Sequence, residues 1–307
     1  MHLVIILFAL FASLFTLQKE TLNFASPFFI VGFRMSLAGI LLLLYAKLTN
    51  KTSKFKLKHL KVLGALTIFQ IYLANVCEIW SLKYMTSSKA CLFFSLSPFL
   101  SALIAFVILK ETISSKKWLG MIIGFAGLIP ILLNQSQQEF TSGNILIFSY
   151  AELVLLIAII ASVYGWIILK QVLQDLNYST IFANGISMFF GGILALIHSF
   201  LAGENWDPFP VNNVYKFLSL SVLMCIISNI ICYNLYGILL KRFTATFMSF
   251  AGLITPLFAS LFGFLFLQES ISWHYFASIG FFTIGLAIFH QEEIKLSKYN
   301  SNYKINT

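Results

Sequence analysis

Charged residues are scarce in this chain of 307 amino acids. Only 10% of its residues are Asp, Glu, Lys or Arg, compared with about 25% in an ordinary soluble domain. Hydrophobic residues make up 59% of the chain and aromatic residues 16%. These proportions exclude a soluble globular protein. A membrane-spanning helix uses roughly 20 apolar residues, so the chain has room for about ten of them.

Sequence motifs of catalysis, metal binding and nucleotide binding are missing. The cysteines form no CxxC pair and lie inside apolar runs, as small hydrophobic residues do: Cys77, Cys91, Cys225 and Cys232. The five histidines are scattered, and there is no HExxH, no DHHC run and no GxxxxGKS/T loop. We therefore expect no metal, no cofactor, and neither an enzyme nor an ATP-driven pump. A membrane enzyme or a channel is the alternative from another functional class.

The net charge of +9 comes largely from short polar connections. Six lysines lie in segment 47–61, between two apolar runs, which is typical of a cytoplasmic loop and not of a nucleic-acid-binding surface. If the N-terminus is inside, 15 of the 20 Lys and Arg residues fall on the cytoplasmic side. The positive-inside rule thus predicts cytoplasmic N- and C-termini for a multi-pass protein, with a bacterial inner membrane as its location.

Polar breaks divide the sequence into ten apolar runs. We expect an all-α integral membrane protein whose ten transmembrane helices cover about 3–19, 27–46, 60–81, 89–109, 117–133, 145–169, 179–201, 216–239, 245–267 and 273–290.

An internal repeat relates two parts of the chain. A shift of 158 residues places 83–111 on 241–269 without a gap. The shift superimposes a proline and a later glutamate, Pro98 on Pro256 and Glu111 on Glu269. Apolar helices share Leu and Phe by composition alone, whereas the spacing of a proline and a glutamate is specific. We interpret the pattern as an ancestral duplication.

The duplication predicts how the chain is divided. A first repeat covers 1–137, a second covers 138–291, and 292–307 forms a polar cytoplasmic tail. Five helices per repeat is an odd number, so the second repeat enters the membrane from the opposite side. Inverted repeats are common in secondary transporters, where the substrate site lies between the halves.

Ionisable residues inside the apolar runs are candidates for function, because each is costly in a bilayer. Arg34, Glu78 and Glu152 are all expected in the outer half of the membrane. The two acids are candidates to bind a cationic substrate group or a coupling proton, and Arg34 an anionic group. The alternative is a structural pair between Arg34 and a glutamate. Lys89 is interpreted as a lysine whose amine reaches the membrane surface.

Polar and aromatic residues follow helical spacing on the third and eighth helices. They are Tyr72, Asn75, Glu78 and Trp80 on the third helix, and Asn229, Tyr233 and Tyr236 on the eighth. Amide and phenol groups need partners in hydrocarbon, so these stripes are expected to face the interior. They either contact substrate or hydrogen-bond between helices.

Two prolines and three glycines are expected to shape the bundle. Pro98 and Pro256 predict paired kinks or hinges at a central cavity, and Ser97 beside Pro98 is a further substrate candidate. Gly120, Gly124 and Gly127 predict close packing of the fifth helix, either on the tenth helix or on a second protomer. The oligomer is therefore expected to be a monomer or a homodimer. Glu111 and Glu269 are interpreted as turn and cap residues.

Several of these residues together resemble the EamA family of the drug/metabolite transporter superfamily. They are Lys19, Arg34 in Gly32-Phe33-Arg34, the proline-bearing fourth helix ending in Leu109-Lys110-Glu111, and Gly120 and Gly127. The resemblance covers nearly the whole chain, although the first helix lacks the family's frequent Trp-Gly pair and the second half has no counterpart of Arg34. It implies ten helices as two inverted five-helix repeats and alternating-access transport of small organic solutes.

Three stretches are also similar to S-adenosylmethionine carriers of intracellular bacteria, namely Ser26–Phe29, Tyr72–Asn75 and Phe94–Leu100. The expected function is a secondary transporter of a small polar metabolite, with S-adenosylmethionine or S-adenosylhomocysteine as candidates. Amino-acid or general metabolite export is the alternative within the same class. The expected partners are this substrate and the lipid bilayer.

Overall fold

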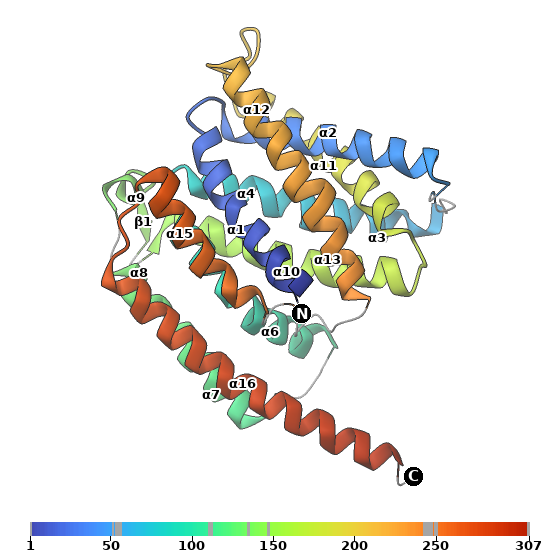
Figure 1. Ribbon diagram of the computed structural model, residues 1–307, viewed down its shortest axis with the longest axis vertical. Coiled ribbons are helices and arrows are strands. Elements are labelled where there is room, and N and C mark those ends of the chain that lie inside the picture. The colour runs from blue at the N-terminus through green and yellow to red at the C-terminus, as the bar shows by residue number, and fades with distance from the viewer. Residues whose placement is uncertain are drawn as a thin grey trace.

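The computed structural model describes residues 2–50, 52, 57–109, 113–133, 136–145, 148–241, 248 and 251–305. Apart from one short hairpin, these residues form helices and their connections (Figure 1). The elements before the hairpin are α1 (His2–Thr21), α2 (Pro27–Leu48), η1 (Leu57–His59), α3 (Leu60–Leu66), η2 (Thr67–Leu73), α4 (Ala74–Leu82), α5 (Ser87–Phe93), η3 (Phe94–Leu96), α6 (Ser97–Leu109), α7 (Ser115–Ala126), α8 (Leu128–Leu132) and α9 (Gln137–Thr141).

The hairpin pairs strand β1 (Asn144–Ile145) with strand β2 (Phe148–Ser149) in antiparallel register. It is followed by α10 (Tyr150–Gln174), α11 (Thr180–Leu201), α12 (Val214–Met224), η4 (Cys225–Cys232), α13 (Tyr233–Leu240), η5 (Gly252–Ile254), α15 (Thr255–Leu267) and α16 (Trp273–Ile305).

Seven helices in the described part of the chain are long and apolar enough to cross a membrane. They are His2–Thr21, Pro27–Leu48, Leu57–Leu82, Ser87–Ile104, Tyr150–Gln174, Thr180–Leu201 and Val214–Leu240. Two further apolar helices are shorter, Thr255–Leu267 and Trp273–Phe289. The prediction of an all-α, multi-pass membrane protein is confirmed. The predicted span 117–133 is divided between α7 and α8, and part of 245–267 lies outside the described residues.

One predicted helix start is wrong. The helix expected from 145 begins at Tyr150, because Ser149 and Glu152 form a capping box: the Ser149 hydroxyl accepts from the Glu152 N–H at 3.2 Å, and the Glu152 carboxylate accepts from the Ser149 N–H at 2.7 Å. At the other end, α16 continues through Ile305. Its apolar part, Trp273–Phe289, agrees with the predicted span 273–290, and the described part of the expected polar tail is helical.

Helical irregularities recur at a spacing of 158 residues. The π-helical segments η2 and η4 begin at Thr67 and Cys225, and each is followed by an α-helix. Widened turns leave carbonyl groups to be satisfied. Asn75 Nδ2 donates to the carbonyls of Gln70 and Ile71, and Asn234 Nδ2 donates to those of Asn229 and Ile230. An amide side chain thus supports each π segment.

Each proline lies just after a 3-10 turn, at the junction between that turn and an α-helix, where the sequence predicts a kink or hinge. Pro98 is the second residue of α6 and Pro256 the second residue of α15, and each helix follows a three-residue 3-10 turn. A proline in the first turn of a helix removes no N–H that the helix needs. The two junctions between a 3-10 turn and an α-helix therefore lie at equivalent positions, 158 residues apart.

The two helices at the lower edge of Figure 1, α7 and α16, pack backbone to backbone. A Cβ atom added to Gly120 would lie 2.6 Å from the Gly285 carbonyl oxygen, and one added to Gly285 would lie 2.5 Å from that of Gly120. Only glycine permits this approach. The prediction that the fifth helix packs on the tenth within one chain is confirmed.

Glutamates from the C-terminal half cap helices of the N-terminal half. The Glu204 carboxylate accepts from the N–H groups of Phe28 and Phe29 at the start of α2, both at 2.9 Å. The Glu269 carboxylate accepts from the N–H groups of Ser87 and Ser88 at the start of α5, at 2.6 and 3.1 Å. The prediction of a capping role is confirmed for Glu269, whereas Glu111 lies outside the described residues.

Candidate functional site

A cavity of about 150 Å³ lies between helices of the two halves. The first half contributes α1, α4, α5, η3 and α6, and the second contributes α10, η4, α13, η5 and α15. The lining residues are Phe8, Phe11, Leu14, Phe15, Gln18, Asn75, Glu78, Cys91, Phe94, Ser97, Ser101, Ser162, Val163, Trp166, Ile167, Ser228, Tyr233, Tyr236, Met248, Gly252 and Thr255. Aromatic rings, hydroxyls, two amides and one carboxylate therefore face a shared space.

Helix α1 supplies one wall. Phe8, Phe11, Phe15 and Gln18 follow each other at steps of three or four residues, which places them on one face of the helix. Phe15 contacts Phe94 with ring centroids 5.4 Å apart. This wall is absent from the sequence-based prediction, although the spacing of the three phenylalanines and the glutamine was a visible signal.

The second half supplies an aromatic wall. The Trp166 and Tyr236 ring centroids are 4.0 Å apart, and those of Trp166 and Tyr233 are 5.2 Å apart. Phe11 approaches both tyrosines across the cavity at 6.3 and 6.2 Å. The two tyrosines were predicted from their stripe, whereas Trp166 was missed because an isolated tryptophan in an apolar run has no distinguishing pattern.

The polar wall is built on α4. Asn75 and Glu78 line the cavity, and Arg34 lies behind them with 1% of its surface exposed. Arg34 Nη2 donates to Asn75 Oδ1 at 3.0 Å, while Asn75 Nδ2 lies 3.4 Å from the Tyr233 hydroxyl. Arg34 also interacts electrostatically with Glu78. The guanidinium thus orients the amide and supplies a countercharge to the carboxylate without lining the cavity itself.

The cavity gathers five of the ten predicted substrate-binding residues: Asn75, Glu78, Ser97, Tyr233 and Tyr236. The other five lie outside its lining. Tyr72 and Asn229 contact other helices: the Tyr72 hydroxyl lies 3.1 Å from His198 Nδ1, and Asn229 Nδ2 lies 2.9 Å from Met35 Sδ. The Trp80 ring lies 4.9 Å from the ring of Tyr84, in the turn that follows α4.

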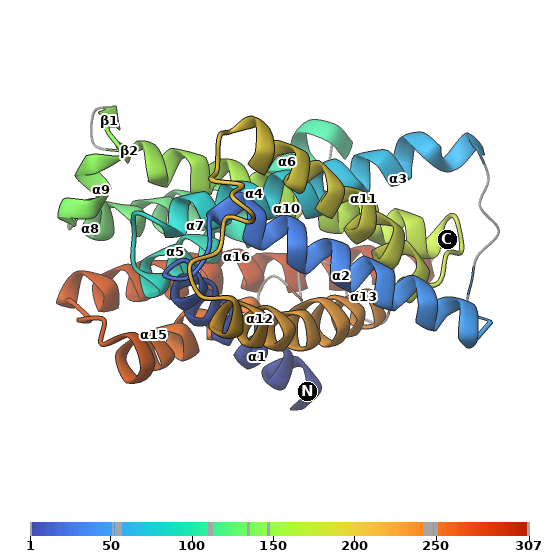
Figure 2. The ribbon, with the colours of Figure 1, turned by 90° about the horizontal axis from the view of Figure 1, so that it is seen from above.

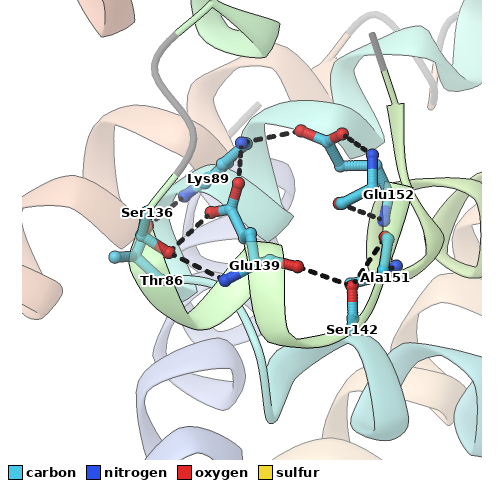
Figure 3. A network of polar contacts seen from close by, with 9 residues as sticks. Thr86, Lys89, Ser136, Glu139, Ser142, Ala151 and Glu152 are labelled. Carbon is cyan, nitrogen blue, oxygen red and sulfur yellow. Dashed lines mark hydrogen bonds and ion pairs between the residues drawn. The ribbon is translucent and has the colours of Figure 1, made fainter. Parts of the chain in front are cut away.

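Glu152 belongs to a separate cluster of charges (Figure 3), on elements that lie at one end of the bundle in Figure 2. Lys89 Nζ lies 2.5 Å from Glu139 Oε2 and 2.7 Å from Glu152 Oε1, and all three side chains are buried. The interpretation of Lys89 as a surface-reaching lysine is wrong, because two carboxylates hold its amine inside the protein. Glu152 was expected seven residues into its helix and instead lies in the first turn of α10.

The cluster connects three parts of the chain. Lys89 lies on α5, Glu152 on α10, and Glu139 on α9 between the two halves. Burial raises the pKa of the Glu139 carboxyl above that of an ordinary glutamate, and the adjacent Lys89 amine partly offsets this effect. The Lys89 amine is paired with both carboxylates of the cluster.

Comparison with known proteins assigns the chain to a protein family. The sequence profile of the EamA-like transporter family matches residues 1–133 and 149–290. The chain belongs to this family. A Chlamydia muridarum protein named S-adenosylmethionine/S-adenosylhomocysteine transporter is 36% identical to this EamA-like transporter, over 93% of this chain and 90% of its own length. A Chlamydia trachomatis serovar L2 protein of the same name is 34% identical, over 93% of this chain and 87% of its own length.

The fold of this EamA-like transporter also matches a solved one. A structure described as "Crystal structure of protein" is 15% identical, with a TM-score of 0.63 over 94% of this chain and 96% of the other. At this identity the likeness concerns the fold. The family and the names of the relatives are those of transporters and not of enzymes.

Proposed function

We propose that this EamA-like protein is a secondary transporter that moves S-adenosylmethionine and S-adenosylhomocysteine across a membrane by alternating access. The observation that carries the proposal is the cavity between the two halves, with the Glu78 carboxylate among aromatic and amide side chains. S-adenosylmethionine presents a sulfonium, an ammonium, a carboxylate and a flat purine, and each can find a complementary group there. The names of the two chlamydial relatives support the same substrate.

The proposed architecture has ten membrane spans in two inverted repeats, 1–137 and 138–291. The π segments, the 3-10 turns and the proline-bearing helices recur at 158 residues, which supports a duplication. Helices α3 and α4 run in the opposite direction to α12 and α13 (Figure 2), as inversion requires. The shorter helices α7 with α8, α15 and α16 complete the count beyond the seven long spans.

Within the cavity, we assign substrate contact to Asn75, Glu78, Ser97, Tyr233 and Tyr236. Arg34 is assigned to position Asn75 and to balance the Glu78 charge. Alternating access needs a wall that can change shape, and the paired junctions at Pro98 and Pro256 adjoin cavity residues Ser97 and Thr255. We therefore assign the hinge to these junctions.

Counterflow in proteoliposomes tests the function. Vesicles that contain purified protein and unlabelled S-adenosylmethionine should accumulate radiolabelled S-adenosylmethionine, and external S-adenosylhomocysteine should compete. Glu20→Gln is a matched control for Glu78→Gln, because it removes a carboxylate of α1 that lies outside the cavity lining. Uptake of amino acids with no S-adenosylmethionine counterflow would replace the proposal by amino-acid export.

Reporter fusions test the proposed orientation, in which both termini are cytoplasmic and the membrane is a bacterial inner membrane. A fusion after Lys58 should report the cytoplasm, and a fusion after Asp207 should report the opposite side. The positive-inside count gives this result for ten spans. The same compartment for both fusions would contradict the arrangement.

A further inference from the structure

The cavity is chemically different at its two ends. Asn75 and Tyr233 occupy positions 158 residues apart, and their side chains meet at 3.4 Å. From this contact α4 and α13 run in opposite directions (Figures 1 and 2). Glu78 lies three residues further along α4, and Tyr236 three residues further along α13. At about 1.5 Å per residue, the carboxylate and the Tyr236 ring are about 9 Å apart along the helix axes.

The Glu78 end carries the negative charge. Glu78 is the one acidic side chain among the described residues that line the cavity. Gln18 of α1 also lines the cavity, and Arg34 is the nearby countercharge. A buried carboxylate attracts a cationic group, because the interaction replaces hydration that the cavity wall cannot supply.

The opposite end is aromatic. Trp166 packs on Tyr236 at 4.0 Å, and the rings of Phe8 and Phe11 approach Tyr236 at 6.3 and 6.2 Å. On α1, Phe8 and Gln18 are ten residues apart, which corresponds to about 15 Å of helix. Two helices from different halves therefore give the same order, with the acid at one end and the ring cluster at the other.

We propose that the substrate binds in one orientation, with its cationic centre at Glu78 and Gln18 and its flat ring against Trp166 and Tyr236, so that Trp166 determines specificity for the ring. The inference rests on the proposed function and adds to it. The repeat explains why the two ends of the cavity differ, because the 158-residue shift relates Glu78 to Tyr236. Positions that are equivalent in the repeat have become a carboxylate and a phenol at the two ends of one cavity.

The reverse placement would have the aromatic cluster hold the cation. Aromatic faces attract ammonium and sulfonium groups, so the rings alone do not decide the orientation. The carboxylate of Glu78 does, because it is the one acidic group among the described lining residues, and a cation placed there adds a favourable contact that an uncharged purine cannot supply. Fragments of the substrate separate the two placements experimentally.

The test is competition against labelled S-adenosylmethionine counterflow with two fragments. Adenosine carries the ring without the cation, and S-methylmethionine carries the sulfonium without the ring. In Trp166→Leu, inhibition by adenosine should weaken about 10- to 100-fold, the size of one lost base–aromatic stack, while inhibition by S-methylmethionine stays unchanged. In Glu78→Gln, inhibition by S-methylmethionine should weaken about 10- to 100-fold, while inhibition by adenosine stays unchanged.

Controls separate this inference from the function on which it rests. Absence of counterflow in the wild type would contradict the proposed function. Counterflow with the opposite fragment pattern, with both fragments weakened equally by Trp166→Leu, or with no competition by adenosine would overturn the orientation. Trp118→Leu, which removes a 40% exposed tryptophan of α7, should leave both fragments unchanged. Trp166→Phe retains a ring and should restore most adenosine binding if the leucine variant folds poorly.

Discussion

Two glutamates of the same chemical type have opposite surroundings in this transporter. Glu78 faces the cavity, with Arg34 and Gln18 near it and open space for a ligand. Glu152 is fully buried, holds Lys89 at 2.7 Å and caps its own helix through Ser149. Both were candidates for substrate binding from sequence. The comparison shows that the partners already present, and not burial alone, distinguish an acid that faces open space from an acid that an ion pair holds in place.

The largest effect is expected from breaking the structural cluster. Lys89→Met leaves the carboxylates of Glu139 and Glu152 buried without their cation, so the free energy of unfolding should fall by about 3–5 kcal/mol. Thermal unfolding and the yield of monodisperse protein in detergent measure this loss. Lys83→Met removes an exposed lysine near the same helix end and serves as the control. Wild-type stability in Lys89→Met would show that the cluster does not hold the halves together.

The cavity acid should behave in the opposite way. Glu78→Gln should leave the folded protein intact and weaken S-adenosylmethionine binding by about 1.5–3 kcal/mol, because a charge-assisted contact becomes a neutral one. S-adenosylhomocysteine lacks the sulfonium charge, so its affinity should fall less. Competition in counterflow measures both. An equal loss for the two ligands would mean that Glu78 does not meet the sulfonium.

A coupling role for Glu78 predicts a different result from the same variant. If the carboxylate carries a proton, Glu78→Gln should abolish accumulation driven by a proton gradient and leave exchange intact. Comparing accumulation with exchange in the same vesicles distinguishes this role from substrate contact. Unchanged affinity together with unchanged accumulation would leave a purely structural role.

The sequence predicted the scaffold better than the site. Apolar runs, the positive loop and the repeated Pro98 and Pro256 indicated a helical membrane protein with related halves. Half of the predicted residues line the cavity. Asn75 and Glu78 could be predicted because an amide or an acid is conspicuous in an apolar helix. Phe11 and Trp166 were missed, since aromatic residues occur on every helix and only tertiary packing decides which face the cavity.

Sequence could not assign Glu152 for a related physical reason. Its distance from the expected helix start suggested a position within the bilayer, but Ser149 moves that start to Tyr150. The Ser149-Tyr150-Ala151-Glu152 signature of a capping box was present in the chain. The partner Lys89 lies on another helix, so no local pattern predicted that contact.

The proline junctions should affect movement more than stability. Pro98→Ala and Pro256→Ala allow the preceding 3-10 turn to join the helix, which should change the free energy of unfolding by less than about 1 kcal/mol and slow transport. Initial counterflow rates per folded molecule measure the effect. Pro27→Ala alters a proline that only begins α2 and is the control. Wild-type rates for both junction variants would show that the junctions are static.

The smallest effect is expected for Glu139, the second acid of the structural cluster. Burial raises its pKa, so the folded protein binds a proton at a higher pH than the unfolded chain does. The ionised carboxyl therefore costs stability above the folded pKa, and this cost disappears as the pH falls. Glu139→Gln should be more stable than the wild type by less than about 1 kcal/mol at neutral pH, with the difference shrinking in mild acid. Unfolding temperatures across pH 4–8 measure the trend, and a difference that grows in acid would contradict it.

The caps that Glu204 and Glu269 provide have a consequence for biosynthesis. Phe28 and Ser87 leave the ribosome long before their acceptors, which lie 176 and 182 residues further along the chain. At a synthesis rate of about 5–20 residues per second, the carboxylates that cap α2 and α5 are synthesised roughly 9–36 s after the N–H groups that they accept from. During that interval the nascent first half sits in the bilayer with open helix ends.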